Sequence, residues 1–214
     1  MDIRLIIVQA FVILFAITVH EAAHAWTASK LGDPTAAALG RASLNPLVHI
    51  DLIGTLIFPL ILILFRQPVF GWAKPVPYNP RNLRDPRRGG LWISFAGPIA
   101  NFATAGTAVV LFRVLRPFGA RITDVSALSR PLEGLSVVLL FTALINISLA
   151  VFNLIPIPPL DGSGILAGLL SGKAAAAYAR LRPYGFLILL ALIYTNALAL
   201  VFSPVHNLIL KLFA

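Results

Sequence analysis

Four apolar segments of this chain are each long enough to cross a lipid bilayer, which requires about 20 residues in a helix. A chain in lipid must satisfy its backbone hydrogen bonds internally, so few folds remain open to it. Charged residues make up only 12% of the sequence, against about 25% in a soluble domain. We therefore predict an all-α polytopic membrane protein. The predicted spans run from Ile3 to Trp26, Leu91 to Leu115, Leu135 to Ile155 and Tyr184 to Val205.

Two further apolar segments are too short to be assigned as spans. Leu52 to Phe65 contains Pro59, and its length is typical of a re-entrant or interfacial element. Ser163 to Ala179 is rich in Gly and Ala and is interrupted by Lys173. The predicted fold is thus a bundle of about four transmembrane helices with one or two re-entrant or short segments.

The first predicted span ends with three ionisable residues, His20, Glu21 and His24, in the sequence HEAAH. A helix places residues i and i+4 on one face, so both imidazoles can bind one metal ion with Glu21 beside it. Ionisable groups at membrane depth are costly, and their presence indicates a functional site. The chain has no cysteine, so any metal must be bound by His, Asp or Glu.

Asp161, just after the third predicted span, is the acidic residue that could join the two histidines as a ligand. It reaches their side of the membrane only if Leu52 to Phe65 does not cross. The basic residues support that topology, because four crossings place eleven of the 17 Lys and Arg residues on the side of the histidines. By the positive-inside rule this side is cytoplasmic. The basic residues do not form a surface interspersed with aromatic side chains, so no nucleic-acid partner is expected.

Two more features have two interpretations each. Gly71 to Tyr78 contains Pro75 and Pro77, which exclude a continuous helix. It is either a solvated loop or an extended, β-like loop near the active site that binds an unwound substrate. Asn101, in the second predicted span, either contacts a neighbouring helix or contacts the substrate backbone.

Three motifs in this order, HEAAH, AGPIANF and FNLIPIPPLDG, resemble those of the site-2 protease family of intramembrane zinc metalloproteases. The sequences GRASLNPLVHIDLIGT and GWAKPVPYNPRNL resemble the small prokaryotic members, which lack PDZ and CBS domains. The resemblance implies one Zn²⁺ per chain, bound by His20, His24 and Asp161, with Glu21 as general base and acid. It also implies that Asn153 contacts the substrate.

These implications lead to a specific functional hypothesis. We expect residues 1–214 to form a single membrane-embedded peptidase domain, with a catalytic core at about 3–162 and a C-terminal helical segment at 163–214. The expected enzyme is a zinc metalloendopeptidase of the cell membrane. It would hydrolyse a peptide bond within or near a transmembrane helix of a substrate protein, with its active site toward the cytoplasm.

The main alternative function is a membrane zinc transporter. A transport pathway requires metal ligands or acidic groups on several central helices. The predicted spans from Leu91 to Leu115 and from Leu135 to Ile155 contain no Asp, Glu or His, which disfavours transport. Of the other histidines, His49 is either structural or a gating or supporting group, and His206 is expected at the membrane interface.

Overall fold

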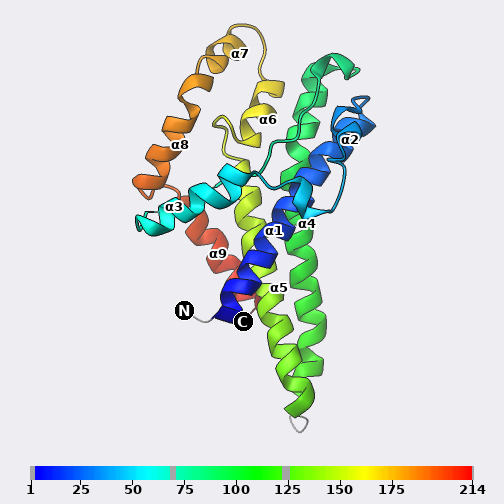
Figure 1. Ribbon diagram of the computed structural model, residues 1–214, viewed down its shortest axis with the longest axis vertical. Helices are drawn as coiled ribbons and strands as arrows, with labels where there is room; N and C mark the ends of the chain where they lie inside the picture. Colours follow the sequence, from blue (N-terminus) through cyan, green and yellow to red (C-terminus); the bar gives the residue numbers. More distant parts are fainter. Residues whose placement is uncertain (1–2, 68–70, 122–125, 214) are drawn as a thin grey trace.

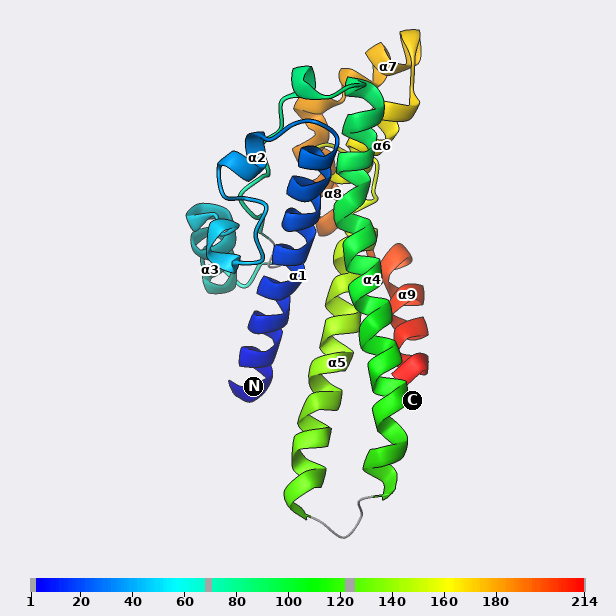
Figure 2. The ribbon, with the colours of Figure 1, turned by 90° about the vertical axis from the view of Figure 1, so that its right-hand side faces the viewer.

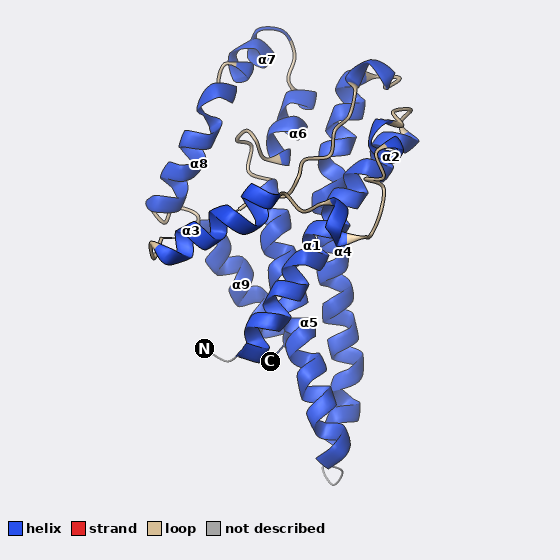
Figure 3. Ribbon diagram, viewed as in Figure 1, coloured by secondary structure: helices blue, strands red, loops and turns tan. Residues whose placement is uncertain are grey.

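The computed structural model describes residues 3–67, 71–121 and 126–213. Within these ranges the chain is helical and contains no strand (Figure 3). The α-helices are α1 (Ile3–Lys30), α2 (Thr35–Ala38), α3 (Phe58–Leu64), α4 (Pro86–Arg121), α5 (Ser126–Asn153), α6 (Asp161–Leu169), α7 (Gly172–Ala179), α8 (Gly185–Tyr194) and α9 (Ala199–Phe213). Shorter turns of helix occur at η1 (Pro46–Val48), η2 (Leu52–Ile57), η3 (Pro80–Asn82) and η4 (Arg182–Tyr184).

The helices α1, α4 and α5 form the central bundle and run along the long axis of the molecule (Figures 1 and 2). Their interfaces are built from small residues, because small side chains let helix backbones approach closely in a membrane. The helix α9 packs against the C-terminal half of α4 and the middle of α5, with the rings of Phe112 and Phe213 4.3 Å apart. The buried alanines of this bundle include Ala16, Ala105, Ala108, Ala143 and Ala150.

Four helical segments in the described part of the chain are long and apolar enough to span a membrane, as predicted in number. The first three, Ile3–Lys30, Pro86–Arg116 and Gly134–Asn153, contain most of the predicted spans. The fourth prediction was misplaced, because the candidate span is Gly172–Tyr194. The helix ends before Asn196, which has a left-handed φ of 55°, and Asn is a residue that ends helices in this way.

The short segment from Leu52 to Phe65 forms η2 and α3. In Figure 1, α3 lies across the long axis of the molecule, at an angle to the bundle. Asp51 caps the start of η2, with its Oδ1 accepting a hydrogen bond from the Gly54 N–H at 2.7 Å. The segment is therefore a short helical element beside the bundle rather than a fourth member of it.

The predicted β-like loop is an extended loop without strand pairing. Trp72 N–H donates to the Gly54 carbonyl at 3.1 Å, and Lys74 N–H donates to the His49 carbonyl at 2.9 Å. The buried Arg41 donates from Nη2 to the Lys74 carbonyl. Prolines at 75 and 77 lack the N–H groups that could add further hydrogen bonds of this kind, so these contacts do not extend into a strand ladder.

The end of this loop is held by Asp33, which follows α1 and is fully buried. Its carboxylate accepts hydrogen bonds from the Thr35 hydroxyl at 2.6 Å, the Asn82 side chain at 2.7 Å and the Asn79 N–H at 2.7 Å. Burial raises the pKa of Asp33, but these hydrogen bonds outweigh burial and lower the pKa to about 2. Asp33 thus ties the end of α1 to the approach to α4.

Candidate metal centre

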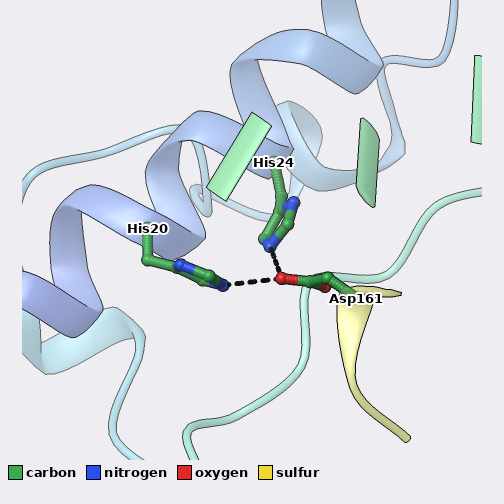
Figure 4. Close-up of side chains that lie close together, drawn as sticks. All are labelled: His20, His24 and Asp161. Carbon is green, nitrogen blue, oxygen red and sulfur yellow. Dashed lines mark ion pairs between the residues drawn. The ribbon is translucent and has the colours of Figure 1, made fainter. Parts of the chain in front are cut away.

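Two histidines of α1 and one aspartate of α6 meet inside the bundle (Figure 4). His20 and His24 are 4% and 7% exposed, and their rings lie edge to face with centroids 4.7 Å apart. The Nε2 atoms of His20 and His24 are 2.9 Å and 3.3 Å from Asp161 Oδ2. One ligand atom from each residue lies within 4.8 Å of the others. The structure thus brings together the three residues that were predicted as metal ligands.

Asp161 reaches this position because the backbone unwinds after α5. The prolines at 156, 158 and 159 prevent the helix from continuing, and α6 starts at Asp161 itself. At Gly162 the chain folds back so closely that a Cβ atom would lie 2.3 Å from the Leu154 carbonyl oxygen. The turn therefore requires glycine next to the aspartate.

The far side of each imidazole contacts a hydrogen-bond acceptor. His20 Nδ1 lies 2.5 Å from Asn101 Oδ1, and His24 Nδ1 lies 2.6 Å from the Ile93 carbonyl oxygen. Because each Nδ1 faces an acceptor, each carries its proton there in the neutral ring, and each Nε2 presents a lone pair. Hydrogen bonds of this kind orient metal-binding histidines in general.

With both rings neutral, three acceptor atoms face one another, an arrangement that a bound cation would balance. Among the described residues, Asp161 Oδ2 makes no hydrogen bond apart from its two ion-pair contacts. Two imidazole nitrogens and one ionised carboxylate match the three-ligand set of catalytic zinc sites, so the residues fit a zinc ion.

Gly97 of α4 lies directly against the two imidazoles. A Cβ atom at this position would be 2.5 Å from His24 Nε2 and 2.6 Å from His20 Nε2. Those distances leave no room for a side chain, so the backbone of α4 can lie this close to the two Nε2 atoms only with glycine at this position. The glycine of the AGPIANF motif thus provides the space around the ligand atoms.

A cavity of about 360 Å³ opens at the three residues. Glu21, which is half-buried, lines it next to His20. Asn153 at the end of α5 also lines it, and its Nδ2 donates to the Leu149 carbonyl at 3.0 Å. The extended loop contributes Trp72, Ala73, Pro75, Val76 and Tyr78 to the wall.

The other predicted residues have different surroundings. Asn101 is fully buried and does not line the cavity; it contacts α1 and α5 instead, which supports the interhelical interpretation over the substrate contact. His49 is buried, and its Nε2 donates to the Ser43 carbonyl at 2.8 Å, as expected of a structural histidine. His206 Nε2 shares a hydrogen bond of 2.7 Å with Ser148 Oγ, which joins α9 to α5.

Sequence reasoning missed two residues near the site. Asn146 is a fully buried amide in the middle of an otherwise apolar span, and such a position alone indicates a specific partner. Arg41 is 4% exposed. Burial lowers the pKa of its guanidinium, while the nearby Glu21 carboxylate raises it. A buried arginine cannot be recognised from a polar loop sequence.

Comparison with known proteins gives consistent matches. The family model described as "Peptidase family M50" matches residues 8–194. The chain is 37% identical to "Putative zinc metalloprotease YwhC" of Bacillus subtilis (strain 168), over 94% of this chain and 89% of the relative. It is 30% identical to "Putative zinc metalloprotease Rip2" of Mycolicibacterium smegmatis (strain ATCC 700084 / mc(2)155), over 86% of this chain and 66% of the relative. No solved structure matches the chain.

Proposed function

The chain belongs to peptidase family M50, the site-2 protease family, and is a membrane zinc metalloprotease; we propose that it hydrolyses a peptide bond within or near a transmembrane helix of another membrane protein. The observation that supports this most is the position of the cavity. It contains Glu21 and the His20, His24 and Asp161 cluster, and it is lined by spanning helices. A substrate held in the bilayer could reach such a site from the side.

His20, His24 and Asp161 would hold the zinc ion through their Nε2 and Oδ2 atoms. When bound, zinc supplies a Lewis acid for the peptide carbonyl and lowers the pKa of a water molecule to about 7. Glu21 lines the same cavity and would accept the proton of the attacking water. It would then pass that proton to the leaving amine as general acid.

A helical substrate must unwind before cleavage, because its peptide carbonyls are hydrogen-bonded within the helix. The freed backbone groups then need new partners. Asn153 and the extended loop around Val76 line the cavity and offer polar atoms for this purpose. Helix-breaking residues near the cleavage site should therefore speed the reaction.

The domain organisation and topology are part of the same proposal. Residues 1–214 would form one peptidase domain with a catalytic core at about 3–162. The excess of Lys and Arg on the side of the histidines supports a cytoplasmic active site in the cell membrane.

The test uses the purified protein in liposomes with a single-span reporter that carries Asn-Gly near the cytoplasmic end of its helix. A matched reporter carries Leu-Leu at the same positions. The wild-type protein should contain one zinc ion and cleave the Asn-Gly reporter faster. Glu21→Gln should keep zinc and lose activity by at least about 1,000-fold, whereas Asp161→Ala should lose zinc.

Three outcomes would contradict the proposal. Full activity of Asp161→Ala would mean that the third ligand is misassigned. Equal cleavage of both reporters would remove unwinding from the mechanism. Zinc flux across the liposome membrane that disappears in His20→Ala, without any proteolysis, would favour the transporter alternative.

A further inference from the structure

Two asparagines lie between the spanning helices directly behind His20. Asn101 on α4 and Asn146 on α5 are both fully buried. Asn101 Nδ2 donates to Asn146 Oδ1 at 2.7 Å and to the Ala16 carbonyl of α1 at 3.1 Å. The proposed chemistry of the cavity uses neither side chain, so their pairing requires a separate explanation.

The orientation of Asn146 is fixed by the backbone of its own helix. Its Nδ2 donates to the Thr142 carbonyl oxygen at 2.9 Å. A side-chain amide has two orientations that exchange oxygen and nitrogen, but the exchanged one would set two oxygens against each other. Since a carbonyl only accepts hydrogen bonds, Asn146 must direct Oδ1 toward Asn101.

The same argument fixes Asn101. Both hydrogens of its Nδ2 are donated, one to Asn146 and one to the Ala16 carbonyl, and both partners are acceptors. Asn101 Oδ1 is therefore left for His20 Nδ1, at 2.5 Å. An amide oxygen can only accept, so the neutral His20 ring must carry its proton on Nδ1 and keep a lone pair on Nε2.

We propose that Asn146 and Asn101 form an asparagine relay that fixes the tautomer of His20 and thereby sets the zinc affinity of the site. This inference rests on the proposed function, because it concerns the same metal centre. Asn101 and Asn146 are positioning residues, since they act through His20. Removal of a supporting hydrogen bond of this kind weakens metal binding by about 10- to 100-fold in other metal sites.

His24 offers an internal comparison. Its Nδ1 faces the Ile93 backbone carbonyl directly, at 2.6 Å, so its tautomer does not depend on any side-chain amide. A change in the relay should therefore alter His20 and leave His24 unchanged. General damage to helix packing would affect both rings.

The test compares full-length Asn146→Leu, Asn146→Ala and Asn146→Asp proteins with the wild type. Asn146→Ala is included because the bulk of Leu could cause misfolding. Asn146→Asp keeps an acceptor oxygen toward Asn101, and its protonated carboxyl group donates to the Thr142 carbonyl. Thr142→Val is the matched control, because its hydroxyl bonds only to the Val138 carbonyl among the described residues and its backbone carbonyl is retained.

Two quantities are measured. Competition with a chromophoric chelator gives the zinc affinity, and nitrogen-15 NMR of histidine-labelled, metal-free protein gives the tautomers at a pH where the rings are neutral. In Asn146→Leu and Asn146→Ala the Ala16 carbonyl still accepts one hydrogen of Asn101, so zinc should bind up to about tenfold more weakly. The Nδ1–H tautomer should become less populated at His20 alone. Asn146→Asp and Thr142→Val should behave as the wild type does.

Wild-type zinc affinity and an unchanged His20 tautomer in both Asn146→Leu and Asn146→Ala would overturn the relay. That result would leave the proposed protease intact, because Glu21→Gln and Asp161→Ala test it separately. If the wild-type protein itself bound no zinc, the proposed metal centre would fail together with the relay.

Discussion

The metal centre and the C-terminal arm formed by α7, η4 and α8 are held in opposite ways. Around the centre the polar side chains of His20, His24, Asn101 and Asn146 are buried and hydrogen-bonded. In the arm, which the structure describes throughout, Gly185 and Leu189 are the buried residues. Tyr178 and Tyr194 attach it through hydroxyl contacts to the Pro156 carbonyl at 2.8 Å and to Gln67 at 3.4 Å.

This difference in burial and hydrogen bonding indicates that the two regions tolerate substitution to different degrees. Polar groups inside a membrane protein need fixed partners, so the centre tolerates little change. The arm exposes Phe186, Leu187 and Tyr194, side chains that lipid can cover, and few polar contacts resist its displacement. We infer that substitutions at the centre change chemistry, whereas substitutions in the arm change activity only slightly.

Among the substitutions that test this comparison, the largest effect is expected for Gly97→Ala. The added methyl group would lie 2.5 Å from His24 Nε2, so the ligand atoms must move apart. Proteolysis should fall by about 100-fold or more, because displacements of about 1 Å have such effects, and zinc content should fall with it. Gly106→Ala on the same helix meets no atom within 4 Å and should match the wild type. Normal zinc content in Gly97→Ala would refute the predicted packing.

The second effect concerns stability and pH. Asp33→Asn should lower the free energy of unfolding by about 2 kcal/mol, because a buried carboxylate loses charge-assisted hydrogen bonds. The folded pKa of Asp33 is about 2, below the ordinary 3.8. Its contribution is therefore complete above about pH 4 and is lost as pH falls toward 2. Thermal unfolding from pH 6 to pH 2 should show the two proteins converging, and a constant difference would contradict this assignment.

A smaller effect is expected for Arg41→Met. The substitution removes the donor to the Lys74 carbonyl, so the extended loop loses one of its attachments while the ligands stay in place. We expect a severalfold higher KM and unchanged zinc content, measured with the Asn-Gly reporter. Arg66→Met, at an exposed position after α3, is the control. Loss of zinc in Arg41→Met would show that Arg41 supports the centre rather than the loop.

The smallest effects are expected in the arm. Tyr178→Phe removes a hydrogen bond worth about 1 kcal/mol, and Tyr194→Phe removes a longer, weaker contact. Both variants should retain zinc and change the cleavage rate by less than about threefold. A tenfold loss in Tyr194→Phe would show that the arm is coupled to the centre, and the comparison between the two regions would then fail.

The sequence predicted most of the metal centre because its signals are local or carried by a motif. His20 and His24 are one helical turn apart, and the proline-rich motif marks where Asp161 is presented. The span count also followed from apolar length. Their roles as zinc ligands remain a prediction, since it is the proximity of the three side chains that the structure shows.

Other features depended on tertiary contacts that the sequence does not encode locally. The fourth span was misplaced because hydropathy does not register the left-handed turn at Asn196. Asn101 was assigned two possible roles because its partner Asn146 lies on another helix. The extended loop was predicted correctly as non-helical, but the prolines at 75 and 77 that indicated it also prevent β pairing.

The placement of Asp161 after α5 has a consequence for the biosynthesis of the enzyme. The two histidines lie on α1, whereas the carboxylate follows α5, the third of the candidate spans. During synthesis the ribosome must complete α1, α4 and α5 before the third proposed ligand exists. On the proposed ligand set, a nascent chain would hold an incomplete site and would not cleave neighbouring helices while it is being inserted. Proteolytic activity would begin only once the bundle has assembled around Asp161.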